Sequence, residues 1–279
     1  MAVYNHDATQ IATVSEDGSA KVWDAEIGML LLDLNGQNSN VNFAMYNRDG
    51  TRIVTTLKDG SAKVWDTKSG TLLFDLKRHR LWFNVKFAMF NSDGTRIITS
   101  YMYSTKVWDA ETGALLFELG HSSEYALYNP DDTRFITVGF DATIKVWNAE
   151  TWSLLFSMNE HSDDVKSVMY NSDSTRIVTA SDDKTAKVWD AETGALLINL
   201  KGHKGSVNSA MYNSDGSNIV TASFDGTVKV WDSQTGECLD TIKNIPGLMV
   251  KGVDLRHLHS DCTFSDEDKE ILRRYGAII

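Results

Sequence analysis

Short apolar runs separated by polar turns fill most of the chain, and the stretch from Val165 to Leu200 shows the pattern clearly. Val165–Tyr170 is rich in apolar residues, 171–174 reads Asn-Ser-Asp-Ser, and 176–180 contains Ile, Val and Thr. Two more runs, 185–189 and 195–200, each follow a polar turn. Runs of this length between turn residues are typical of β-strands. The stretch therefore predicts four short strands joined by tight turns.

The same pattern recurs along the chain with a regular period. Six tryptophans mark the period and are spaced 42, 43, 39, 42 and 42 residues apart. Each lies in the string Lys-Val-Trp-Asp, or Lys-Val-Trp-Asn in the fourth copy: Trp23, Trp65, Trp108, Trp147, Trp189 and Trp231. A single four-stranded sheet cannot bury both of its faces, so we expect the six units to stack around an axis as a β-propeller.

The repeated Lys-Val-Trp-Asp string is similar to the WD40 repeat, as are the Gly-His pairs at Gly120-His121 and Gly202-His203. The similarity covers about residues 2–242. It implies an all-β fold, a WD40-type β-propeller of six four-stranded antiparallel blades. We expect residues 1–242 to form the propeller and residues 243–279 to form a short extension that contains a helix and packs on it.

The resemblance also gives a structural role to polar residues that recur in each repeat. In the family, His, Ser, Asp and Trp side chains of one blade form a buried hydrogen-bonded tetrad. Two repeats have all four members: His161, Ser181, Asp183 and Trp189, and His203, Ser223, Asp225 and Trp231. The second repeat has Gln37 in place of His, and the third has Met102 in place of Asp. A catalytic triad is disfavoured because the trio recurs at the blade period instead of occurring once in an exposed cleft.

Loop residues that differ between repeats are the candidates for partner binding, because the strands are committed to packing. Six positions before the Trp, five repeats have an aspartate, called the turn Asp below. The residue before this position differs between repeats and is Glu16, Lys58, Tyr101, Phe140, Asp182 or Phe224. The third repeat also has an insertion that adds Trp82 and Phe83 to a loop. The candidate partner-binding residues are Trp82, Phe83, Lys86, Tyr101, Phe140, Lys166, Asp182 and Phe224. The alternative for Trp82 is that it folds back to fill the space left by the incomplete tetrad of its own blade.

Motifs of catalysis and cofactor binding are absent from the sequence. It has no phosphate-binding Gly-rich loop with Lys-Ser/Thr, no His-Glu-x-x-His and no Gly-x-Ser-x-Gly. His257, His259 and Cys262 could approach a metal, but a fourth ligand is not evident. We therefore predict that the protein is not an enzyme and uses no cofactor and no metal.

Charge and cysteine content narrow the class of partner and the compartment. The net charge of −11 disfavours nucleic acid and anionic membranes, and it favours a protein or peptide partner with a basic patch. The two cysteines, Cys238 and Cys262, lack a disulfide framework, which fits a reducing compartment. No apolar run approaches the roughly 18 residues of a membrane span. We expect a cytoplasmic protein.

The two ends of the chain raise the question of ring closure. Ala2-Val3-Tyr4-Asn5 aligns with residues 44–47, so the chain begins within a first strand and no blade is shared between the termini. Either a six-bladed ring closes by side-chain packing, or the chain is part of a longer protein.

The C-terminal extension is similar to those of bacterial WD40-repeat proteins. Ser-Asp-Glu-Asp at 265–268 predicts a helix start, Ile271, Leu272 and Tyr275 give an apolar face, and Gly276 ends the helix. We expect this segment to cover an exposed blade face.

The leading functional hypothesis is a non-catalytic scaffold or sensor that binds a protein or peptide through the propeller loop face. The alternative is an oligomerising assembly unit, or the detached sensor portion of a larger signalling protein. A propeller hydrolase is the hypothesis with the least support. The sequence leaves the partner and the oligomeric state open.

Overall fold

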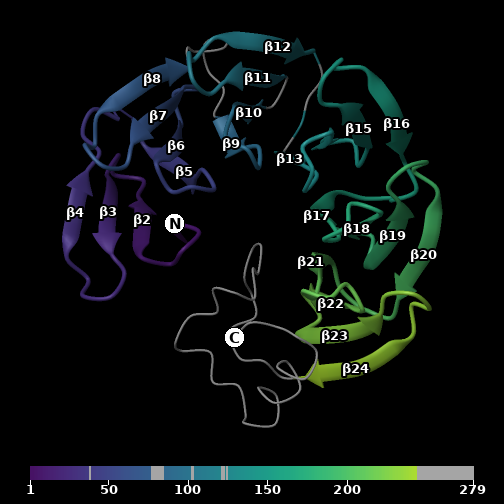
Figure 1. Cartoon of the computed structure of the whole chain (residues 1–279). Coiled ribbons are helices and arrows are strands. Elements are labelled where there is room, and N and C mark those ends of the chain that lie inside the picture. Colours follow the sequence, from purple (N-terminus) through teal and green to yellow (C-terminus); the bar gives the residue numbers. More distant parts are fainter. Residues whose placement is uncertain (38, 77–84, 102–103, 121–122, 124, 244–279) are drawn as a thin grey trace. The chain divides into compact units, whose positions relative to one another are not determined.

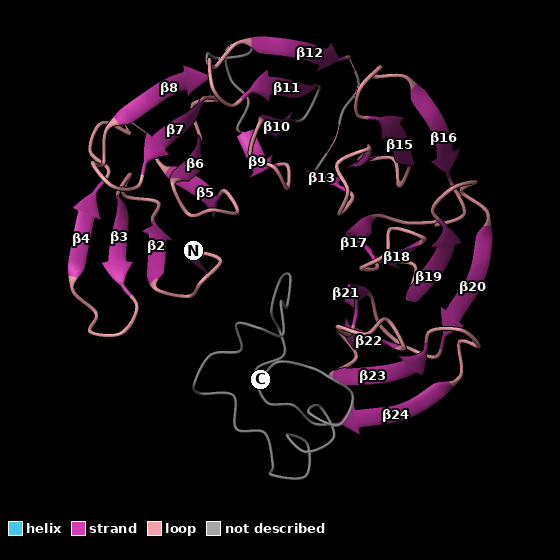
Figure 2. Ribbon diagram, in the orientation of Figure 1, coloured by secondary structure: helices cyan, strands magenta, loops and turns pink. Residues whose placement is uncertain are grey.

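The computed structural model describes residues 1–37, 39–76, 85–101, 104–120, 123 and 125–243. Within these residues it has six four-stranded antiparallel sheets and no helix (Figures 1 and 2). The predicted all-β architecture of six four-stranded units is confirmed. The helix expected near residues 265–276 lies outside the described residues, and the domain boundary after residue 242 therefore stays a prediction.

Strands follow one another in sequence order within each sheet. The first sheet contains β1 (Ala2–Tyr4), β2 (Gln10–Val14), β3 (Ala20–Asp24) and β4 (Leu30–Asp33). The second contains β5 (Val41–Tyr46), β6 (Arg52–Leu57), β7 (Ala62–Asp66) and β8 (Leu72–Leu76). The third contains β9 (Val85–Phe90), β10 (Arg96–Tyr101), β11 (Thr105–Asp109) and β12 (Leu115–Leu119).

The remaining three sheets repeat this order. The fourth contains β13 (Tyr125–Tyr128), β14 (Arg134–Val138), β15 (Ile144–Asn148) and β16 (Leu154–Met158). The fifth contains β17 (Val165–Tyr170), β18 (Arg176–Ser181), β19 (Thr185–Asp190) and β20 (Leu196–Lys201). The sixth contains β21 (Val207–Tyr212), β22 (Asn218–Ser223), β23 (Thr227–Asp232) and β24 (Cys238–Lys243). The strand bounds of the fifth sheet agree with those predicted from its apolar runs to within one residue.

The strands separate into two compact units. One unit comprises residues 1–140 and 145–155, and the other comprises residues 141–144 and 156–279. The first three sheets and most of the fourth belong to the first unit, and the fifth and sixth sheets belong to the second.

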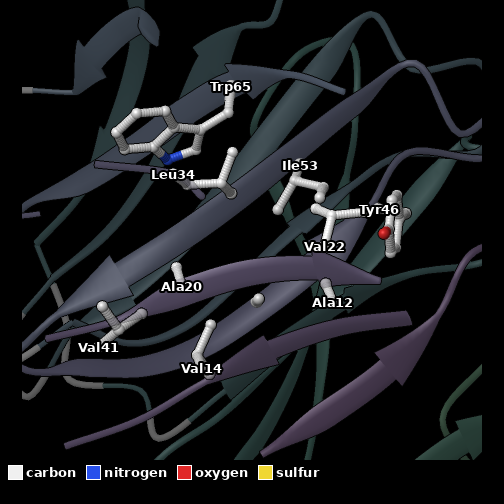
Figure 3. Packing of buried hydrophobic residues seen from close by; sticks show 10 residues of the cluster. Ala12, Val14, Ala20, Val22, Leu34, Val41, Tyr46, Ile53 and Trp65 are labelled. Carbon is white, nitrogen blue, oxygen red and sulfur yellow. The ribbon is translucent and has the colours of Figure 1, made fainter. Parts of the chain in front are cut away.

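The core lies between consecutive sheets, because side chains alternate between the two faces of each strand. We call the face that packs on the following sheet the forward face. In the first sheet the forward face packs against the second sheet, where Tyr46, Ile53 and Trp65 are buried (Figure 3). The forward face of the first sheet consists of small aliphatic residues: Ala12, Val14, Ala20, Val22 and Leu34.

The second unit is built in the same way. The fifth sheet packs its forward face against Tyr212, Ile219 and Trp231 of the sixth. That forward face consists of Val178, Ala180, Ala186, Val188 and Leu200. Small aliphatic side chains on one sheet therefore pack against Tyr, Ile and Trp on the next in both units.

Candidate functional site

A chain of hydrogen-bonded side chains crosses the fifth sheet inside its core. Trp189 Nε1 donates to Thr179 Oγ1 at 2.9 Å, and His161 Nε2 lies 2.7 Å from the same hydroxyl. On the other side of the imidazole, His161 Nδ1 lies 2.7 Å from Asp183 Oδ2. Because the Thr179 hydroxyl accepts from the indole, its proton is available for Nε2, and the imidazole then donates from Nδ1 to the carboxylate.

The sixth sheet repeats this arrangement. Trp231 Nε1 donates to Thr221 Oγ1 at 2.8 Å, and His203 Nε2 lies 2.7 Å from that hydroxyl. His203 Nδ1 lies 3.1 Å from Asp225 Oδ2. The two C-terminal sheets therefore contain the same network of His, Thr, Asp and Trp.

The serines expected in these networks lie elsewhere, and this part of the sequence interpretation is wrong. Ser181 Oγ donates to the Asp163 carbonyl at 2.9 Å and accepts from the Asp183 amide at 3.1 Å. Ser223 makes the equivalent bonds to the backbone of Gly205 and Asp225. Both serines end their strands beside a turn, so their hydroxyls bind turn backbone. The hydroxyl between Trp and His belongs to the threonine two residues earlier.

The Trp–Thr bond recurs in all six described sheets, including those without a complete network. Threonine precedes the tryptophan by ten residues in five repeats and by nine in the third, a spacing that the sequence interpretation missed. The six bonds are Trp23–Thr13 (2.7 Å), Trp65–Thr55 (3.0 Å), Trp108–Thr99 (2.8 Å), Trp147–Thr137 (2.9 Å), Trp189–Thr179 (2.9 Å) and Trp231–Thr221 (2.8 Å). This pair is the invariant centre of the repeat.

In the second repeat an amide replaces the imidazole. Gln37 is buried, and Thr55 Oγ1 donates to Gln37 Oε1 at 3.2 Å while accepting from Trp65. Gln37 therefore occupies the place of the missing histidine against the threonine hydroxyl.

The protonation equilibria of these groups fit a structural role. Burial lowers the pKa of His161 and of His203, although the partner aspartates oppose the shift. Burial alone would raise the pKa of Asp183, but hydrogen bonds from Thr185 and His161 outweigh it and hold the pKa well below its usual range. The His161 side chain is 0% exposed, so a substrate cannot reach it in this conformation.

The residue before the turn Asp, which varies between repeats, makes contacts between neighbouring strands and sheets. Lys58 Nζ lies 3.1 Å from Glu16 Oε1, which joins the turns of the first two sheets. Lys166 Nζ lies 2.8 Å from Asp182 Oδ2 and 3.2 Å from Asp164 Oδ2. Of the predicted partner-binding residues, Lys166 and Asp182 are therefore brought together.

The two aromatic residues of this position that the structure describes are exposed. Lys86 Nζ lies 4.7 Å from the ring centroid of Phe140, a cation–π contact between the third and fourth sheets. Phe140 is 36% exposed, and Phe224 in the second unit is 53% exposed. Phe224 presents the largest exposed apolar group among the described candidates.

The side chains of the other candidates lie outside the described part of the structure. Trp82 and Phe83 lie outside the described residues, so both interpretations of Trp82 stay predictions. Tyr101 is the last residue of β10. The weighed metal ligands His257, His259 and Cys262 also lie outside the described residues. Among the described residues there is no group of three or more His, Cys, Asp or Glu placed to hold a metal, and no helix able to cross a membrane.

Comparison with known families agrees with this architecture. The family model described as WD domain, G-beta repeat, matches the chain at residues 1–24, 28–66, 113–148, 152–190 and 194–232, which together cover more than half of it. The matched stretches leave out residues 67–112, where the third repeat has its insertion and lacks the turn Asp. A search of curated proteins gives no match.

Proposed function

The chain belongs to the WD40-repeat family, and on that basis we propose that it is a non-catalytic scaffold or sensor that binds a protein or peptide. WD40 domains generally bind other proteins. The proposed contact surface is the edge of the sheets where the second strand turns into the third. Its described residues in the second unit, called the turn edge below, are Lys166, Asp182 and Phe224, and Lys86 and Phe140 hold the corresponding positions in the first unit.

The exposure of Phe224 carries this proposal. At the same position in other repeats, Glu16 pairs with Lys58, and Asp182 pairs with Lys166. Phe224 instead places a phenyl ring, 53% exposed, in a turn that is otherwise polar. Turn backbone needs no such group for its own stability, and exposed aromatic side chains surrounded by polar residues tend to mark contact sites.

Charge supports a partner with a basic patch. The chain carries a net charge of −11, and at the turn edge of the fifth sheet two carboxylates, those of Asp164 and Asp182, lie within 3.2 Å of the Lys166 ammonium. A cationic peptide would be attracted to this edge, and its arginine or lysine side chains could stack on Phe224.

Affinity measurement with turn-edge variants tests the proposal. A partner identified by capture with the wild-type chain is titrated against Phe224→Ala, and we expect binding weaker by about 2 kcal/mol, or roughly 30-fold. The matched control is Leu239→Ala, which removes another exposed apolar group, 41% exposed, from β24, away from the turn edge. If Phe224→Ala binds as the wild type does, or if Leu239→Ala weakens binding as much, the turn edge is not the contact surface.

A second candidate function is assembly with other copies, and exposed leucines favour it. The fourth strand of each sheet exposes leucine near its start: Leu30, Leu31, Leu72, Leu73, Leu115, Leu116, Leu154, Leu155, Leu196, Leu197 and Leu239. Contiguous exposed apolar surface is a recognised basis for association. Light scattering tests this second candidate, because an assembly unit has a mass that rises with concentration, and a mass that stays that of a monomer rules assembly out.

The proposal also includes a cytoplasmic location and the absence of catalysis. The acidic surface and the lack of a disulfide framework support the location, which cell fractionation tests. Burial of the His–Asp pairs supports the absence of catalysis. Turnover in a panel of hydrolase substrates that survives purification but is lost in His161→Ala would overturn it.

A further inference from the structure

The sixth sheet has a forward face like that of the fifth, although no seventh repeat follows it in the sequence. Each residue of this face lies 42 residues after its equivalent in the fifth sheet. The face consists of Val220, Ala222, Val228, Val230 and Ile242. All five side chains are 0–3% exposed, as buried as the face that the fifth sheet packs on the sixth. A covered apolar face requires something that covers it.

At the edge of this face, the sixth sheet lacks an apolar side chain that in other sheets contacts a turn of the following sheet. Nine residues after their tryptophans, Phe74 and Ile198 lie against turn glycines of the following sheets, Gly113 and Gly236, so closely that a Cβ on either glycine would overlap them. The sixth sheet has Asp240 at this position. Asp240 therefore offers no apolar side chain for a contact of this kind.

A second sheet-to-sheet contact is missing as well. Arg52, Arg96 and Arg176, at the start of the second strand, each donate from Nη1 to a backbone carbonyl in the following sheet, in the last case to Ser233 at 2.7 Å. The sixth sheet has Asn218, whose short amide donates to Ser217 Oγ at 2.9 Å. The sixth sheet therefore keeps the apolar centre of the forward face and lacks both of these contacts at its edge.

We infer that the C-terminal segment, residues 244–279, binds the forward face of the sixth sheet in place of another blade. The segment has 36 residues and continues directly from Lys243, next to Ile242 of the face. The face is four strands wide, or about 15 Å, which a few extended residues at about 3.3 Å each can cross. The sequence supplies apolar side chains without counterparts in the repeats: Ile271, Leu272, Tyr275, Ile278 and Ile279.

Thiol labelling of the full chain tests the inference. The background carries Cys238→Ser and Cys262→Ser, and Val230→Cys places a single thiol in the face. Maleimide labelling is compared between the native segment and a segment with its five apolar residues changed to serine. We expect labelling of residue 230 to become faster by about tenfold or more when the segment loses its apolar side chains, because a buried thiol reacts only when its cover opens.

The matched control is Val188→Cys, the equivalent position between the fifth and sixth sheets, which is also 0% exposed. Its labelling is expected to stay slow in both versions. Equal rates at residue 230 in both versions overturn the inference. The inference is also overturned if the protein has the mass of a dimer and the protection of residue 230 from labelling is lost on dilution, because a second copy then covers the face.

A second measurement covers the case in which the serine segment unfolds the whole domain, so that both thiols become reactive. A protease site replacing residues 245–247 is cut after folding, and the released segment is removed. We expect residue 230 to become reactive while residue 188 stays protected, and we expect added peptide 248–279 to restore protection. Protection that persists without the segment, or that the peptide fails to restore, overturns the inference.

Discussion

Replacing Asp225 with alanine tests whether the His–Asp–Thr–Trp network stabilises the fold. Asp225 Oδ2 accepts from His203 Nδ1 at 3.1 Å and from the Lys204 amide at 2.7 Å. Asp225 Oδ1 accepts from the Thr227 amide at 3.0 Å and from the Thr227 hydroxyl at 2.6 Å. Asp225→Ala removes all four bonds and leaves the buried Nδ1–H of His203 with the Thr227 hydroxyl, 3.1 Å away, in place of a charged acceptor.

The size of the effect follows from what remains buried. Hydrogen bonds to a charged group contribute about 1.5–3 kcal/mol each, but the exposed turn amides regain water when the carboxylate is removed. The loss is therefore dominated by the charge-assisted His203 bond, for which the Thr227 hydroxyl is a weaker acceptor, and we expect destabilisation of about 2–4 kcal/mol.

Urea unfolding at neutral pH, followed by tryptophan fluorescence, measures this loss. Asp17→Ala is the matched control, because Asp17 holds the same turn position in the first repeat, where it is exposed and accepts from the Ser19 amide. We expect a much smaller change for Asp17→Ala. Equal losses for the two variants would refute a stabilising role of the network beyond its turn.

Three further predictions follow from the same contacts. Thr179→Val is expected to lower the free energy of unfolding in urea by about 2–3 kcal/mol, because it leaves the indole and the imidazole Nε2 without a hydrogen-bond partner. Ser181→Ala is expected to lower it by about 1 kcal/mol. The reverse order would contradict the assignment of Thr179 as the bridging hydroxyl. Because the pKa of His161 is lowered in the folded state, the unfolded chain takes up more protons as the pH falls below about 6.5, and the free energy of unfolding should drop there. His161→Gln should make this drop smaller. The same drop between about pH 7 and 5 in the variant and the wild type would disprove the reasoning. Amide hydrogen exchange should be faster in residues 1–110, where His or Asp of the network is missing, than in residues 165–243, and uniform protection would mean that sheet packing dominates.

The sequence predicted the strands well because each repeat carries the same local signals. Apolar runs and turn residues placed β17 to β20 to within one residue. The bridging threonine was missed for a physical reason. A β-branched residue inside a strand is expected in any sheet, so Thr179 gave no sign of a special role, whereas Ser181 next to the turn did.

Contacts between repeats could not be predicted from the sequence. Lys86 and Phe140 are 54 residues apart, and their cation–π contact depends on how the third and fourth sheets face each other. Trp152 is a second example, since it holds a turn position where other repeats have glycine and has a φ of 61°. Its ring stacks on Phe117 of the preceding sheet at 5.6 Å, and Arg96 lies over it at 5.0 Å. Packing between sheets sustains a backbone conformation that a bulky residue rarely adopts.

Buried polar residues hold the fold, and the turn edge is the proposed binding surface. The most direct test measures the melting temperature and the partner affinity of Phe224→Ala and Asp225→Ala, two neighbouring residues of one turn. We expect that Phe224→Ala keeps the wild-type melting temperature and loses affinity. We also expect that Asp225→Ala lowers the melting temperature and, at a temperature where it is folded, binds the partner nearly as the wild type does. The opposite pattern, with affinity lost in Asp225→Ala and kept in Phe224→Ala, would contradict this assignment of roles.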